Sequence, residues 1–319
     1  MKEIILVGLG EFGVAWYKTL REMENIRVIV VEKEAGKLER VELDATASYH
    51  SLKQAIRDKN PDFIINATPP QVHKEINDIA FAAELPVLSE KPIAADYFSA
   101  VQMVDRAQRE EIPFAIAENY RNFPIVEQVK KYIAAGEIGE IRTIDILFRK
   151  NFRTDKRYFN KLENPLLYDV AIHHLDLIRY FTDNEASSIL AQNFNPKHSW
   201  FAGNCASYIF VELRNGVAVK YNGNLVVTEK TTDWLGEWTI EGTAGVIEIK
   251  NQQLKLIKEG TTKVENYEAG LYLEKSVQQF IDFLDRGQEP KTLANDYINT
   301  QSLVNFIEKS SAAGKEIKL

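Results

Sequence analysis

The sequence predicts an α/β protein in which a doubly wound parallel sheet is followed by a second domain with an open, mostly antiparallel sheet. Up to about residue 118, short β-branched apolar runs alternate with longer segments of helical period, which is the pattern of stacked βαβ units. From residue 207 onward, strand-length runs follow one another directly. The chain has 319 residues, which is enough for about two domains.

The first domain is predicted to span residues 1–120. Its strands are short, apolar and rich in β-branched residues, which is typical of a parallel sheet covered on both faces. Helices must connect them, because a tight turn cannot join two parallel strands. The expected strands are 3–7, 28–31, 63–66, 86–88 and 114–117, and the expected helices are 12–21, 51–59, 72–83 and 97–110.

The second domain is predicted to span residues 121–319. Arg214-Asn215-Gly216 lies between two alternating runs, and Asn-Gly is a strong hairpin signal because both residues accept a positive φ. The polar region 271–311 is expected to form a helical tail. The other expected helices are 124–135 and 167–181, and the expected strands are 140–149, 207–213, 217–222, 225–228, 237–241, 246–250 and 253–258.

Composition argues against several classes of protein. With 39 basic and 46 acidic residues, the net charge of −7 provides no broad basic face for nucleic acid. Cys205 is the single cysteine, so no disulfide forms within the chain, which is typical of the cytoplasm, where we expect the protein to reside. The sequence contains no run of roughly 18 apolar residues, so we expect no membrane partner.

A glycine-rich turn lies between the first expected strand and the first expected helix. In Gly8-Leu9-Gly10-Glu11-Phe12-Gly13, the first glycine permits a tight turn, the second admits a pyrophosphate to the backbone, and the third lets helix and strand pack closely. Amides at the helix N-terminus would face the anion. This position in the chain predicts that all six residues bind a dinucleotide, and a merely structural turn is the alternative.

Glu32 ends the second expected strand, 22 residues beyond Gly10, where an acidic side chain commonly accepts hydrogen bonds from the adenosine ribose. A carboxylate at this place repels the 2′-phosphate of NADP, so the sequence favours NAD as the cofactor. Lys33 follows directly and offers a cation to a phosphate, which leaves NADP open. The alternative interpretation of Glu32 is an acid at a strand end that faces solvent.

Two further motifs lie at strand ends of the first domain, where open α/β sheets bind their ligands. Ala67-Thr68-Pro69-Pro70-Gln71-Val72-His73 follows one strand, and Glu90-Lys91-Pro92 follows the next. A partly desolvated lysine at such a place can donate a proton to a substrate oxygen or accept one from it. The residues expected to contact the cofactor here are Thr68, Pro69, His73, Glu90 and Lys91.

In this order, the motifs resemble the Gfo/Idh/MocA family, named for glucose-fructose oxidoreductase and inositol dehydrogenase. The resemblance spans nearly the whole chain. It implies an N-terminal Rossmann domain, a C-terminal α/β domain whose open sheet forms an oligomer interface, and NAD(P)-dependent oxidation or reduction of sugars and cyclitols. It also implies that Lys91 is catalytic. The matching segments are Gly8-x-Gly10-x-x-Gly13, Thr68-Pro69-Pro70-x-x-His73, Glu90-Lys91-Pro92, Gly136-Glu137-Ile138-Gly139, Glu241-Gly242-Thr243-Ala244-Gly245 and Gly287-Gln288-Glu289-Pro290.

The expected helix at 167–181 carries two more candidate catalytic residues. Asp169 and His173 are four residues apart and therefore share a face of a helix. An imidazole can take the proton of a substrate hydroxyl, and the carboxylate can orient the imidazole or bind substrate. The pair resembles the family's Asp-x-x-x-His signature. Segment 163–168 departs from the family, because it lacks the glycine run that members often carry, and the choice of sugar is left open.

Neighbours of this pair have other interpretations. His174 lies about 100° farther around the helix, so we expect it to be packed or hydrogen-bonded. A metal site formed by Asp169, His173 and Asp176 is an alternative to the catalytic pair, although we expect no metal, since no third histidine or cysteine lies nearby in the sequence.

Substrate contacts are expected from three more residues. Tyr120 and Arg121 follow the last strand of the first domain, and a hinge is the alternative role for both. Tyr168 directly precedes Asp169. A basic segment then either accommodates an acidic ligand or forms a solvated loop; its residues are Arg149, Arg153, Lys156, Arg157 and Tyr158.

The sequence therefore predicts an NAD(P)-dependent oxidoreductase that acts on a secondary alcohol of a sugar or polyol, or on the corresponding ketone. Lys91 and His173 would transfer the proton, and Asp169 would orient substrate or imidazole. We expect a homodimer or homotetramer formed through the C-terminal sheet, because an open sheet usually needs covering. Two alternatives are a cofactor-binding sensor without turnover and an enzyme that uses NAD as an internal redox relay to cleave a glycosidic bond.

Overall fold

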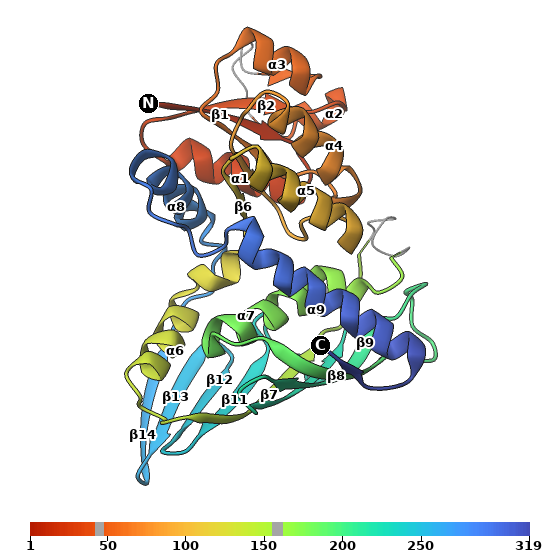
Figure 1. Ribbon diagram of the computed structural model, residues 1–319, viewed down its shortest axis with the longest axis vertical. Coiled ribbons are helices and arrows are strands. Elements are labelled where there is room, and N and C mark those ends of the chain that lie inside the picture. Colours follow the sequence, from red (N-terminus) through yellow and green to blue (C-terminus); the bar gives the residue numbers. More distant parts are fainter. Residues whose placement is uncertain (42–47, 155–161) are drawn as a thin grey trace. The chain divides into compact units, whose positions relative to one another are not determined.

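The computed structural model describes residues 1–41, 48–154 and 162–319, which divide into two compact units (Figure 1). The first unit comprises Met1–Asn119 and Tyr272–Gln301, and the second comprises Tyr120–Leu271 and Ser302–Leu319. The stretch 272–301 therefore packs with the first unit, whereas the boundaries expected from the sequence, 1–120 and 121–319, assign it to the second.

Six parallel strands form the sheet of the first unit, in the order β3-β2-β1-β4-β5-β6. The order changes direction between β1 and β4, and ligands of such sheets bind beyond the carboxyl ends of the strands at this switch point. The predicted doubly wound sheet is confirmed. The strands are β1 (Lys2–Val7), β2 (Ile26–Val31), β3 (Ser48–Tyr49), β4 (Phe63–Asn66), β5 (Val87–Ser89) and β6 (Phe114–Ile116).

Helices cover both faces of this sheet (Figure 1). On one face, Trp16 and Leu20 of one helix and Phe280 of another pack on Phe63 and its neighbours, and the rings of Phe63 and Phe280 meet edge to face at 5.1 Å. On the other face, Phe81 contacts Phe114 in the same manner. The helices are α1 (Glu11–Glu22), α2 (Ala35–Leu38), α3 (Leu52–Asp58), α4 (Pro70–Phe81), α5 (Tyr97–Arg109) and α8 (Leu273–Arg286).

The expectation of a polar tail at 271–311 is wrong for α8. Leu273, Val277 and Phe280 recur at helical spacing, and all three are buried in the core beneath the first sheet. This apolar stripe is the reason why a segment from near the end of the chain belongs to the first unit.

Nine strands form the sheet of the second unit, in the order β14-β13-β12-β11-β7-β10-β9-β8-β15. Strands β7 and β10 are parallel and the remaining pairs are antiparallel, so the predicted mostly antiparallel sheet is confirmed. The strands are β7 (Ile141–Arg149), β8 (Ala186–Phe194), β9 (Ala206–Leu213), β10 (Ala218–Asn224), β11 (Glu237–Gly242), β12 (Val246–Lys250), β13 (Gln253–Lys258), β14 (Thr261–Asn266) and β15 (Ile317–Lys318).

Helices lie on one face of the nine-stranded sheet (Figure 1). Along β9, Ile209 and Val211 are buried, whereas the alternate residues Tyr208 and Phe210 are 46% and 51% exposed on the opposite face. That face is therefore open and partly apolar. The helical elements are η1 (Asn119–Asn122), α6 (Pro124–Ala134), η3 (Leu167–Ala171), α7 (Ile172–Thr182) and α9 (Ala294–Ala313), of which α9 spans the boundary between the units.

Two local predictions are corrected. Residues 225–228 do not form a strand: Val226 makes only an isolated bridge to Asn151, and its N–H donates to the side chain of Asn224. The expected helix 167–181 begins as a π-helical turn, η3, before it continues as α7. Strands β3, β8, β14 and β15 and the short helix α2 were not expected.

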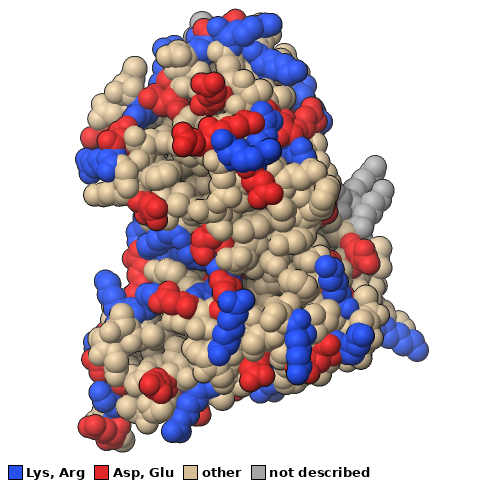
Figure 2. Space-filling view, in the orientation of Figure 1, with Lys and Arg blue, Asp and Glu red and all other residues tan. Residues whose placement is uncertain are grey.

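The surface agrees with the composition. On the face shown in Figure 2, basic and acidic side chains are interspersed. Within residues 1–41, 48–154 and 162–319, no helix is long and apolar enough to cross a membrane.

Candidate active site

The glycine-rich turn joins β1 to α1, as predicted. Gly8 has a φ of +95°, which favours glycine, and a Cβ on Gly13 would lie 2.1 Å from the carbonyl oxygen of Gly8. A Cβ on Gly10 would meet nothing within 4 Å, and no side chain caps α1 at Gly10. The open space over Gly10 and the uncapped helix N-terminus fit the pyrophosphate of a dinucleotide.

The remaining residues of the turn differ in what they expose. The side chain of Leu9 is buried in the core, so a contact of Leu9 with a cofactor would have to use its backbone. Phe12 is 41% exposed and Glu11 is exposed on the first turn of α1.

Glu32 lies at the end of β2 beside the glycine-rich turn. One carboxylate oxygen accepts the N–H of Leu9 at 2.8 Å and the other accepts the N–H of Glu34 at 3.0 Å. The side chain is 5% exposed, so the alternative of a solvent-facing acid is wrong. Lys33 is exposed, and Arg40, which sequence reasoning missed, donates to the carbonyl of Leu9 at 3.4 Å.

His73 links the two motifs at the ends of β4 and β5. Its ring is fully buried, with Nδ1 2.9 Å from the carbonyl oxygen of Pro92 and Nε2 2.8 Å from that of Thr68. Burial lowers the pKa of His73. The imidazole therefore lies between the backbones of the two motifs, a positioning role that sequence reasoning did not assign. A contact of His73 with a cofactor stays a prediction.

Asn66, the last residue of β4, fixes the first of these motifs. Its Oδ1 accepts the hydroxyl of Thr68 at 2.6 Å and the N–H of the same residue at 3.2 Å, while its Nδ2 donates to Asn77 at 2.7 Å. An asparagine at the end of an apolar strand was the signal for this role. Pro69, the N-cap of α4, is exposed.

Glu90 is buried next to Lys91, and the Lys91–Pro92 peptide is cis. The indole Nε1–H of Trp16 donates to one oxygen of Glu90 at 2.7 Å, and the N–H of Lys91 donates to the other at 3.3 Å. Burial raises the pKa of Glu90 to about 7, although the charge of Lys91 acts in the opposite direction. Trp16 lies 74 residues earlier in the chain, and no sequence pattern pointed to it.

His173 lies in the first turn of α7, and the ring of Tyr120 stacks on it. The two ring centroids are 4.0 Å apart with an interplanar angle of 4°. The hydroxyl of Tyr120 donates to the carbonyl of Trp234 at 3.3 Å, and His173 is only 6% exposed. Asp169, which is half-buried, lies in the preceding π-helical turn, and such turns are frequent at functional sites.

His174 is fully buried and hydrogen-bonded, as predicted. Its Nε2 lies 3.0 Å from the carbonyl oxygen of Trp234, which requires a proton on that nitrogen, so Nδ1 accepts from the hydroxyl of Tyr221 at 3.3 Å. Burial lowers the pKa of His174 to about 3, and the ring is therefore neutral at pH 7. The carbonyl of Trp234 thus accepts bonds from both His174 and Tyr120.

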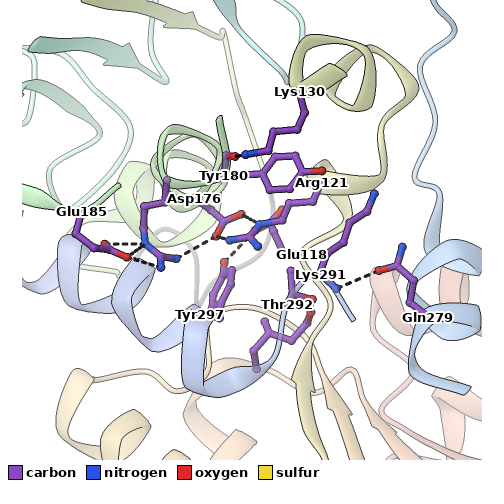
Figure 3. A network of polar contacts seen from close by, with 12 residues as sticks. Glu118, Arg121, Lys130, Asp176, Tyr180, Glu185, Gln279, Lys291, Thr292 and Tyr297 are labelled. Carbon is purple, nitrogen blue, oxygen red and sulfur yellow. Dashed lines mark hydrogen bonds and ion pairs between the residues drawn. The ribbon is translucent and has the colours of Figure 1, made fainter. Parts of the chain in front are cut away.

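Arg121 forms a buried ion pair with Asp176, and Figure 3 shows the guanidinium facing the carboxylate. The two bonds measure 2.7 and 2.8 Å, and the guanidinium lies 5.1 Å from the centre of the Tyr180 ring. This pairing fixes α7 to the segment after β6. It places both charges in an internal contact, so substrate binding by Arg121 stays a prediction and Asp176 is not available as a simple metal ligand.

Other candidates have partners of their own. The hydroxyl of Tyr168 donates to Glu308 of α9 at 2.7 Å. Among the residues that the structure describes, no group of three histidine, cysteine or acidic side chains could hold a metal ion. In the basic segment, Arg153 stacks over Trp200 at 4.1 Å. Lys156, Arg157 and Tyr158 lie outside the described residues.

The comparisons with known proteins agree with this geometry. The family described as "Oxidoreductase family, NAD-binding Rossmann fold" matches residues 2–117, and the "GFO/IDH/MocA C-terminal domain" matches residues 126–248. D-apiose dehydrogenase of Rhizobium rhizogenes is 25% identical over 98% of this chain and 96% of its own. Inositol 2-dehydrogenase of Corynebacterium glutamicum is 26% identical over 56% of this chain and 52% of its own.

Solved structures share the fold over the full length. An oxidoreductase from Agrobacterium radiobacter, in complex with NAD+, L-tartaric acid and magnesium, superposes with a TM-score of 0.93 at 21% identity and covers 99% of this chain and 98% of its own. Two family matches in sequential order, a fitting phosphate loop and a full-length structural likeness lead to one conclusion: the chain belongs to the GFO/IDH/MocA family, and it is an NAD-binding oxidoreductase.

Proposed function

We propose that this oxidoreductase transfers a hydride between nicotinamide and a secondary alcohol, or the corresponding ketone, of a sugar, cyclitol or related small molecule. The similar proteins named as D-apiose and inositol dehydrogenases support this substrate class. The observation that carries the proposal is the arrangement at Lys91, which follows a strand end of the dinucleotide-binding unit and lies between Glu90, which accepts its N–H, and Pro92, whose carbonyl faces His73. When bound, the nicotinamide supplies the hydride acceptor or donor.

Lys91 is assigned the role of an acid–base group at the reacting oxygen. His73 and Glu90 fix the backbone on either side of it, so the start of the lysine side chain is held while its four-carbon stem reaches the substrate. Positioned proton transfer of this kind contributes about 10²–10⁴-fold to turnover.

His173 is assigned proton transfer at the same reaction, and Asp169 the orientation of substrate or imidazole. Stacking on Tyr120 fixes the plane of the His173 imidazole, which defines the directions in which its nitrogens can donate or accept. The neutral His174 does not compete for a proton near pH 7. Tyr168, Tyr120 and Arg121 complete the proposed substrate-binding set.

The cofactor would be held by the glycine-rich turn, by Glu32 at the ribose, and by the motifs at the ends of β4 and β5. Glu32 is a buried, hydrogen-bonded carboxylate and would repel a 2′-phosphate, so we propose NAD as the preferred cofactor. Lys33 and Arg40 lie close enough in sequence to Glu32 that a measurable use of NADP is expected.

A homodimer or homotetramer through the open face of the nine-stranded sheet is also proposed. The exposed rings of Tyr208 and Phe210 and the side chain of Leu190, whose β8 position pairs with Phe210, form an apolar patch on that face. Phe210→Asp should reduce the molar mass measured by light scattering, and an unchanged mass would contradict this interface.

The absence of a second cysteine supports the cytoplasm as the location.

The function is tested by following reduced nicotinamide while sugars, cyclitols and sugar acids are offered with NAD or NADP. Lys91→Ala should lower turnover about 10²-fold or more and retain cofactor binding. Lys91→Arg, which keeps the charge but does not exchange a proton near neutrality, should be similarly impaired. Full turnover in Lys91→Ala would refute the assignment, and release of sugar from a glycoside without net NADH would favour the redox-relay glycosidase.

A further inference from the structure

Trp16 and Glu90 make a contact that the proposed reaction does not use. Trp16 lies on α1, the helix that follows the glycine-rich turn, and is fully buried. Its indole N–H donates to Glu90 Oε1 at 2.7 Å, and Glu90 Oε2 accepts the N–H of Lys91 at 3.3 Å. The carboxyl group of Glu90, which is 7% exposed, therefore connects α1 to the turn that carries Lys91, the proposed acid–base residue.

Three groups decide the charge of this carboxyl. Lys91 and the indole of Trp16 favour the carboxylate, and the charge of Glu118 disfavours it. Glu118 is itself buried and accepts the hydroxyl of Tyr297 at 2.9 Å (Figure 3). Desolvation outweighs the favourable contacts, so the pKa of Glu90 is raised to about 7 and the carboxyl changes charge within the working range of most enzymes.

We infer that Trp16 is a positioning residue for Lys91: its indole N–H shifts Glu90 toward the carboxylate form and so favours an anion beside the lysine. An N–H donor stabilises a carboxylate more than a carboxylic acid, and the effect is strong where water is excluded. Because the charges of Glu118 and Lys91 act on Glu90 in opposite directions, a single hydrogen bond can change the protonation of Glu90. This inference rests on the proposed function, because the charge of Lys91 matters to turnover only if the lysine acts on the substrate.

The first test needs no substrate. The indole ¹⁵N–¹H resonances of the cofactor-free protein are followed by NMR from pH 5 to pH 9, and the Trp16 signal is identified by its loss in Trp16→Phe. We expect this signal to titrate with a midpoint near pH 7 and to become independent of pH in Glu90→Gln. A Trp16 signal that does not titrate in the wild type overturns the inference.

The second test compares two tryptophan variants. Trp16→Phe removes the donor to Glu90 and keeps most of the buried volume. Trp238→Phe is the matched control, because Trp238 is also fully buried and donates its indole N–H at 2.7 Å, but to the carbonyl of Leu235 in the other unit. Both variants are compared with the wild type by kcat/KM as a function of pH, with the cofactor at saturation.

In Trp16→Phe, Glu90 would stay protonated to higher pH, and Lys91 would lose an anionic neighbour. The limb of the profile that reports ionisation of Glu90 near pH 7 should therefore move to higher pH, by roughly half a unit to one unit, and Glu90→Gln should abolish it. Trp238→Phe should leave the limb in place. An unmoved limb in Trp16→Phe, or an equal movement in both tryptophan variants, overturns the inference.

These outcomes are separable from failure of the proposed function. If wild type shows no turnover, or if Lys91→Ala retains it, the proposed function fails, while the NMR titration still reports whether Trp16 senses Glu90. If Trp16→Phe does not fold, as judged by circular dichroism, the pH profile of Glu90→Gln alone tests the inference. This variant preserves the shape of the side chain and an oxygen acceptor for the indole.

Discussion

Lys91 in the first unit and His173 in the second are held by different kinds of contact. Around Lys91, polar side chains bind the backbone: His73 contacts the carbonyls of Thr68 and Pro92. Around His173, a ring lies parallel to the imidazole at 4.0 Å. Hydrogen bonds to the backbone fix where a side chain starts, whereas stacking fixes the plane of the functional group itself. A long, flexible lysine side chain therefore needs a fixed backbone at its start, whereas a short imidazole needs a fixed ring plane.

The two units also bury titratable groups with opposite consequences. In the first, desolvation raises the pKa of Glu90 to about 7; in the second, it lowers the pKa of His174 to about 3. In each case burial favours the neutral form. Burial of Glu90 is therefore expected to cost stability as pH rises, and burial of His174 to cost stability as pH falls.

The largest expected effect comes from the two adjacent histidines. His173→Gln should lower kcat about 10²-fold or more with little loss of stability, since the ring is proposed to take part in proton transfer. His174→Gln should lower the midpoint of chemical denaturation, because it breaks buried bonds to the carbonyl of Trp234 and the hydroxyl of Tyr221. Kinetics and urea unfolding of both variants check this. If His173→Gln mainly unfolds the protein, the division of roles between the two histidines is wrong.

A smaller effect is expected at Tyr120, and it tests whether the stack matters more than the hydroxyl. Tyr120→Leu should lower kcat about tenfold, because the imidazole loses its stacking partner, an interaction of about 1 kcal/mol. Tyr120→Phe keeps the ring, loses only the 3.3 Å bond to Trp234, and should recover most of the activity. Equal losses in both variants would assign the role to the hydroxyl instead.

A third expected effect concerns stability and pH. The folded protein holds a proton on Glu90 up to about pH 7, whereas the unfolded chain releases it near pH 4.5, so the free energy of unfolding should fall as pH rises through this window. Glu90→Gln removes that slope. Relative to wild type, the variant should gain about 1–3 kcal/mol between pH 5 and pH 8.

Urea unfolding at pH 5, 6, 7 and 8 measures this gain. Glu229→Gln, at an exposed site, is the control and should change little across the series. A parallel pH dependence in wild type and Glu90→Gln would show that this carboxyl does not set the slope.

Much of the fold and part of the site could be predicted from sequence. Local patterns located β1, β4 and the glycine-rich turn, because the reasons for these elements lie within a few neighbouring residues. Trp16, Tyr120 and Trp234 acquire their contacts only through folding, since their partners are 74, 53 and 60 residues away in the chain. Burial of Glu90 was equally hidden, because a strand end is normally close to solvent.

The stripe of Leu273, Val277 and Phe280 makes the first unit discontinuous in the chain. A fragment ending near residue 120 would leave Trp16, Leu20 and Phe63 without the side chains that cover them, and such a surface favours aggregation. Recombination between relatives is constrained in the same way. A crossover that exchanges the second unit and keeps the first must cut the gene at three places, near codons 120, 272 and 302, rather than at one.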